Sequence, residues 1–231
     1  MEARALQTTS AGRERRMLHY LQELFRALDF SSIGDVALRA VAVLLCLTVH
    51  ETCHGLAALA LGDPTAKSQH RLSLDPLRHI DWFGLLMMFT VGFGWAKPVP
   101  VDPRYFRHPK RGMALTALAG PLSNFALALA LLGSCRALLT LASPPAALLD
   151  FLVESSILSV GLGVFNLLPV PPLDGSKVLG AFLPDRAYGA LMRYERYGLL
   201  ALLALTWLGI GDGLLSRGIS AVWSALFDFV F

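Results

Sequence analysis

The chain has 231 residues, of which 55% are hydrophobic and only 16% are charged, and its net charge is +3. Soluble domains carry about 25% charged residues, so this composition argues against a soluble protein and predicts a polytopic membrane protein in contact with a lipid bilayer. The small positive charge sits on Lys and Arg residues beside apolar runs, which is typical of loops at a membrane and argues against nucleic acid as a partner.

The N-terminal residues, 1–33, are basic and lack the long apolar core of a secretory signal peptide. Within them, residues 17–28 repeat apolar side chains at helical spacing, which favours an amphipathic helix on the membrane surface. A helix packed on the protein's own loops fits the same pattern. We therefore separate an N-terminal basic segment, 1–33, from a single membrane-embedded domain, 34–231, with a catalytic core at about 35–180.

The apolar runs predict the membrane helices. A helix needs about 20 mostly apolar residues to cross a bilayer. The expected spans lie at about 35–61, 113–135, 147–168, 197–211 and 218–230. Residues 83–94 are apolar but short for a crossing. The predicted fold class is an all-α polytopic membrane protein with about five to six transmembrane helices.

The stretch WAKPVPVDP, residues 95–103, contains three prolines, which exclude a regular helix and favour extended backbone. At membrane depth such backbone occurs only inside protein or beside a watery cavity. We expect a re-entrant loop or hairpin at about 90–103, with an ordinary surface loop as the alternative. The basic loops at 97–111 and 174–197 are joined by two crossings, so both are expected on the cytoplasmic side.

The first expected span carries His50, Glu51 and His54 in its middle. An acidic residue at the centre of a membrane helix costs roughly 2.5–3.5 kcal/mol on insertion scales, so a function is expected there. His50 and His54 are four residues apart and project from one helical face, where both imidazoles can bind one zinc ion. Glu51 can then act as the general base of an HExxH site. A purely structural histidine pair is the alternative.

A catalytic zinc needs a third protein ligand and one open position. The strongest candidate is Asp174 in FNLLPVPPLDGSKVL, because the prolines before it end an apolar helix and deliver its carboxylate at membrane depth. A turn residue at the membrane interface is the alternative for Asp174. Cys53 can also ligate zinc in principle, but it is displaced from the face that carries His50 and His54.

These two motifs carry a resemblance to a known family. HETCH at 50–54 together with NLLPVPPLDG at 166–175 resembles the site-2 protease family of intramembrane zinc metalloproteases. GPLSNF at 120–125 matches the third core helix of that family, and GWAKPVPV at 94–101 is similar to its compact bacterial and archaeal branch.

The resemblance covers about residues 40–180 and implies the site's chemistry. It implies His50, His54 and Asp174 as ligands of one Zn²⁺ per chain, with Glu51 as the base. It also implies that Asn166 helps to position the substrate. No oligomeric state follows from it.

The predicted activity is hydrolysis of peptide bonds in or near transmembrane segments of other membrane proteins. The predicted location is the prokaryotic plasma membrane, with the active site open to the cytoplasm. An unwound substrate can pair with an extended edge, and we expect Val99 to lie on such an edge. Asn124 is expected either to hydrogen-bond across helices, which is favoured, or to hold the substrate backbone.

Two other classes of protein remain open. A non-proteolytic membrane scaffold could keep the fold and a structural zinc, but a structural site needs no base such as Glu51. An ion or proton transporter also places carboxylates in spans, but it does not require HExxH, and no inverted repeat is visible.

Overall fold

The computed structural model describes residues 33–84, 96–141, 143–207 and 212–231. Every regular element in these ranges is a helix, and no strand occurs in them. Residue contacts divide the chain into two units, 1–40 and 41–231, and the packing described below belongs to the second unit. The amphipathic helix expected at 17–28 and most of the short apolar run at 83–94 lie outside the described residues.

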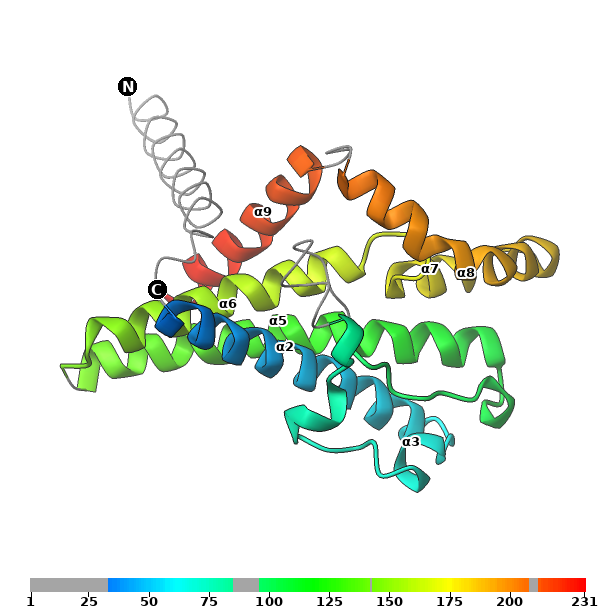
Figure 1. Ribbon diagram of the computed structural model, residues 1–231, viewed down its shortest axis with the longest axis horizontal. Helices are drawn as coiled ribbons and strands as arrows, with labels where there is room; N and C mark the ends of the chain where they lie inside the picture. The colour runs from blue at the N-terminus through cyan, green and yellow to red at the C-terminus, as the bar shows by residue number, and fades with distance from the viewer. Residues whose placement is uncertain (1–32, 85–95, 142, 208–211) are drawn as a thin grey trace. The chain divides into compact units, whose positions relative to one another are not determined.

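The helices are of two kinds (Figure 1). The long ones are α2 (Ile33–Ala60), α5 (Pro109–Leu141), α6 (Ala146–Asn166), α8 (Asp185–Trp207) and α9 (Asp212–Val230). The short ones are the α-helices α3 (Thr65–Ser68) and α7 (Asp174–Gly180) and the 3₁₀ helices η1 (Pro76–His79) and η2 (Pro103–Tyr105). Helix α5 packs most extensively on α6 and α7, and α9 packs on both α5 and α6.

Within the described residues, three helices are long and apolar enough to cross a membrane: Ala37–Ala60 of α2, the whole of α5 and the whole of α6. These candidate spans coincide with the predicted ones at 35–61, 113–135 and 147–168, and the protein is an integral membrane protein. The other two predicted spans, at 197–211 and 218–230, fall largely in α8 and α9 and stay predictions. Helix α8 begins at Asp185 and α7 covers Asp174–Gly180, so much of the basic loop expected at 174–197 is helical. The first turns of α8 carry charged residues and therefore form no apolar run.

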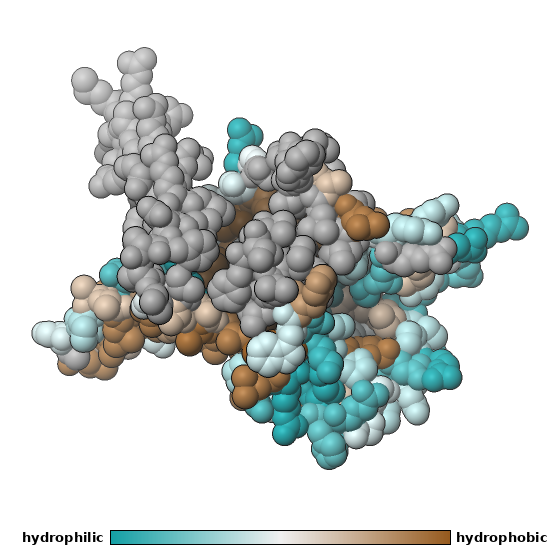
Figure 2. All heavy atoms as spheres, viewed as in Figure 1, coloured by the Kyte–Doolittle hydropathy of each residue, from teal (hydrophilic) through white to brown (hydrophobic). Residues whose placement is uncertain are grey.

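The end of α2 is where the sequence predicted it. The helix stops at Ala60, and Gly62 adopts a φ of +103°, a conformation that favours glycine. Figure 2 shows hydrophilic residues gathered over α3 and the loop after it, while hydrophobic residues gather towards the left of the view, along the visible parts of α2 and α5. Residues 96–102 form no regular element, as their prolines predict. The rest of the expected hairpin, at 90–95, lies outside the described residues.

Small polar side chains join the long helices where they pack. Asn124, Ser155, Ser156 and Ser159 are completely buried. The Oγ of Ser159 in α6 donates to the backbone carbonyl of Asn124 in α5 at 2.8 Å, and the indole N–H of Trp223 in α9 donates to Ser156 at 2.9 Å. Such residues let membrane helices approach closely and hydrogen-bond to each other. They hold α5 and α6 in a fixed relation behind the site described next.

Candidate metal centre

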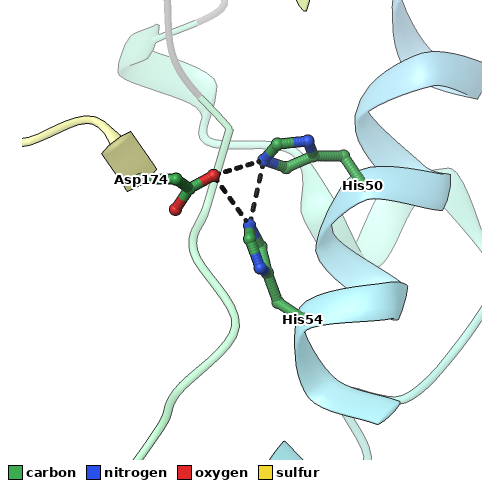
Figure 3. A group of neighbouring side chains, drawn as sticks. All are labelled: His50, His54 and Asp174. Carbon is green, nitrogen blue, oxygen red and sulfur yellow. Dashed lines mark hydrogen bonds and ion pairs between the residues drawn. The ribbon is translucent and has the colours of Figure 1, made fainter. Parts of the chain in front are cut away.

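Two histidines of α2 and an aspartate of α7 meet at one point (Figure 3). The Nε2 atoms of His50 and His54 are 2.9 Å apart. Oδ2 of Asp174 lies 3.1 Å from the first and 3.2 Å from the second. Both histidines are buried, with 4% and 8% exposure. The three residues that the sequence singled out as zinc ligands are therefore brought together from elements far apart in the chain.

The other ring nitrogen of each histidine is held by an acceptor. Nδ1 of His50 lies 2.7 Å from Oδ1 of Asn124, and Nδ1 of His54 lies 2.7 Å from the carbonyl oxygen of Thr116. Because those oxygens only accept, each Nδ1 carries the ring proton and donates it. Each Nε2 then directs a lone pair at the cluster, as in metal-binding histidines whose second nitrogen is anchored.

The cluster fits a metal ion. Oδ2 of Asp174 is buried and accepts no hydrogen bond. Two lone pairs and a carboxylate oxygen this close repel one another unless a cation, either a proton or a metal ion, lies among them. Zinc bound tetrahedrally at about 2.0–2.1 Å places its ligand atoms about 3.3 Å apart, which is near the observed 2.9–3.2 Å.

Helix α5 lies directly against the two imidazoles at Gly120. A Cβ on residue 120 would come within 2.4 Å of Cε1 of His54 and 2.6 Å of Cε1 of His50. Only glycine permits this approach. The approach in turn brings Thr116 and Asn124 of the same helix to the histidines. In the sequence, GPLSNF carried only the family resemblance, and neither Gly120 nor Thr116 was predicted as part of the site.

Two close backbone contacts, at Gly175 and Gly198, hold the loop before Asp174. A Cβ on Gly175 would lie 2.1 Å from the carbonyl oxygen of Leu167, so the turn that presents Asp174 requires glycine there. A Cβ on Gly198 would lie 2.3 Å from the carbonyl oxygen of Pro171, so α8 packs directly on the loop.

Charged side chains add to this support. Nζ of Lys177 in α7 donates to the carbonyl of Pro172 at 3.2 Å and pairs with Glu195 of α8 at 3.0 Å. At the start of α5, Lys110 pairs with Asp185 and lowers the pKa of that carboxyl below its usual value. Asp174 thus follows a loop that packs against α8.

Glu51 is half-buried, and its carboxylate contacts the extended residues 96–102. Its Oε2 accepts a hydrogen bond from the backbone N–H of Val99 at 2.9 Å. Val99 is 7% exposed, and its side chain packs against Gly55, one turn after Glu51. The Val99 amide, expected on an edge open to substrate, is therefore engaged by the predicted base.

The remaining predicted residues occupy different surroundings. Asn124 makes the interhelical hydrogen bond that the sequence favoured, and its partner is His50. Asn166 ends α6, and its side-chain amide donates to Leu162 of the same helix at 3.0 Å. Cys53 is not a member of the metal-binding group found among the described residues.

Comparison with known proteins agrees with this geometry. Residues 138–208, which include Asp174, match the family model of peptidase family M50. The chain is 36% identical over 170 residues to the "Putative zinc metalloprotease YwhC" of Bacillus subtilis, an alignment covering 71% of this chain and 78% of that protein. It is 31% identical over 193 residues to the "Putative zinc metalloprotease Rip2" of Mycobacterium tuberculosis, covering 79% and 71%.

The chain belongs to peptidase family M50. This confirms the resemblance to the site-2 protease family of zinc metalloproteases that HETCH and NLLPVPPLDG carried. No solved structure matches the chain. The roles of individual residues in this M50 protein therefore rest on its own geometry.

Proposed function

We propose that this M50 protein is an intramembrane protease that hydrolyses peptide bonds in or near transmembrane segments of other membrane proteins. The observation that carries the proposal is the anchored pair of imidazoles, whose free nitrogens face the Asp174 carboxylate beside Glu51. We assign His50, His54 and Asp174 as the ligands of one zinc ion per chain. When bound, zinc activates water and polarises the scissile carbonyl.

The chain's own residues divide the remaining work. Glu51 takes a proton from the attacking water and returns it to the leaving amine. Its carboxylate is oriented by the Val99 amide at 2.9 Å. Asn124 and the Thr116 carbonyl keep both ring protons on Nδ1, so that Nε2 stays free for the metal.

The proposed substrate is a transmembrane segment that unwinds before cleavage, because a helix hides its peptide bonds. An unwound strand can lie along the extended segment near Val99. Since Glu51 already accepts from the Val99 amide, the substrate strand is proposed to pair with other backbone groups of the segment, while the Val99 amide keeps the base oriented. Asn166 is the second proposed substrate contact.

The proposed setting is the cell membrane, crossed by five to six helices, with the site open to the cytoplasm. The hydrophilic residues around α3 and the following loop support a polar face at that end of α2 (Figure 2). Water for hydrolysis would enter from this face.

The test compares purified wild type with Glu51→Gln on a panel of single-span membrane proteins. Glu154→Gln, the same change in α6 outside the cluster, is the matched control. We expect wild type and the control to cleave, and Glu51→Gln to bind about one zinc without cleaving. Cleavage by Glu51→Gln at the wild-type rate would refute the role of Glu51.

A further inference from the structure

On the N-terminal side of Val99, hydrogen bonds to backbone groups hold the extended segment, residues 96–102, in place. Its Lys97 amide donates to the carbonyl of His79 at 2.9 Å. Nη2 of Arg71 donates to the carbonyl of Lys97 at 2.9 Å and to that of Pro98 at 3.3 Å. Arg71 is half-buried, and its Nε is buried without a partner. The guanidinium is therefore committed to the two carbonyls that precede Val99.

Downstream of Val99, the segment is held by a buried carboxylate. Asp63 is completely buried just after α2. Its Oδ1 accepts from both the amide and the hydroxyl of Thr65, and its Oδ2 accepts from the Asp102 amide at 2.7 Å. Burying a carboxylate is costly unless such donors compensate it. Asp63 therefore ties the end of the HExxH helix to the end of the extended segment.

The Val99 amide lies between these two anchors. Pro98 and Pro100 carry no N–H, so the segment offers few amides to hold it in place. The amide of Val99 reaches Glu51, and the contacts on either side come from Arg71 and Asp63. Neither Arg71 nor Asp63 belongs to the metal cluster.

We propose that Arg71 and Asp63 are positioning residues for proteolysis, which hold the extended segment on both sides so that the Val99 amide orients the Glu51 carboxylate. The inference rests on the proposed function. A base displaced by even 1 Å can lose about 100-fold in rate. Loss of either anchor is therefore expected to impair cleavage while the cluster still binds zinc.

Two variants with matched controls test the anchors. Arg71→Ala is paired with Arg78→Ala, whose guanidinium donates to the His70 carbonyl in the same loop. Asp63→Asn is paired with Asp75→Asn, an exposed carboxylate that accepts from the Leu77 amide. Asparagine keeps the size of Asp63 but replaces one acceptor oxygen with a donor, so it cannot serve both Thr65 and Asp102.

Hydrogen exchange of the peptide covering 96–102 reports on the anchors without requiring activity. We expect faster exchange and about 10–100-fold lower kcat/KM in Arg71→Ala and Asp63→Asn, with wild-type zinc content. Both controls should behave as wild type. Arg71→Lys should recover part of the activity, because an ammonium group can still donate to the carbonyls.

Unchanged exchange in both variants would overturn the anchoring. Faster exchange with wild-type cleavage would overturn the positioning role. If Asp63→Asn does not fold, Arg71→Ala decides alone, since Arg71 lies closer to the surface. If wild type cleaves no substrate on the panel, both the proposed function and the positioning role are overturned. The exchange rates still show whether Arg71 and Asp63 hold the segment.

Discussion

Gly120→Ala is expected to disable the metal centre through one added methyl group. The new Cβ would lie 2.4–2.6 Å from three atoms of the His50 and His54 rings. Carbon atoms pack at about 3.5–4.0 Å, so the rings or α5 must move by about 1 Å. Metal sites tolerate about 0.2 Å in ligand distance. Disturbing the support of a metal ligand costs about 10–100-fold in metal affinity, and here two ligands are pushed directly.

We therefore expect zinc affinity to fall by at least about 100-fold, which is about 2.7 kcal/mol. The assay is zinc titration of the metal-free protein in detergent against a competing chelator. Gly133→Ala is the control, because it lies on the same helix and its Cβ would meet nothing within 4 Å. Wild-type zinc affinity in Gly120→Ala would refute the account of how α5 packs on the site.

Three further predictions concern the same centre. Gly198→Ala should push the loop at Pro171 away and weaken zinc binding in the same titration, because its Cβ would lie 2.3 Å from the Pro171 carbonyl; unchanged binding would contradict that packing. Asn124→Ala should lower zinc affinity by about 10–100-fold, since His50 loses the acceptor that fixes its tautomer; full affinity would show that the tautomer is set otherwise. Removing zinc with a chelator should abolish cleavage and lower the thermal stability, since free zinc at 100 times its Kd stabilises the folded state by about 2.7 kcal/mol; activity that survives chelation, or is not restored by added zinc, would count against a zinc protease.

The cluster of His50, His54 and Asp174 was predictable because each member follows a local rule. Residues four apart on a helix share a face, which paired His50 with His54. Prolines that end α6 singled out Asp174 as a carboxylate in an unusual place. The apolar run that predicted the first span, 35–61, also gave the end of α2 to within one residue. These features depend on nearby residues alone, and the structure has them as the sequence indicated.

The supports of the site were not predictable because they depend on how distant elements pack. Every residue has a backbone carbonyl, so the residue type does not show that the carbonyl of Thr116 accepts from His54. Gly120 and Gly133 are both glycines of α5, yet of these two only Gly120 lies against the imidazoles. The direction of the Val99 amide depends on the twist of an extended segment rich in proline. Its contact with Glu51 therefore required the structure.

The most direct test of the central claim is the zinc content of purified wild type beside Asp174→Ala, after zinc resupply and removal of loosely bound metal. We expect about one zinc per wild-type chain and a large loss in the variant, because a catalytic site relies on three protein ligands. Wild type without zinc, or a variant that retains it fully, would contradict the assignment of His50, His54 and Asp174 as the metal centre.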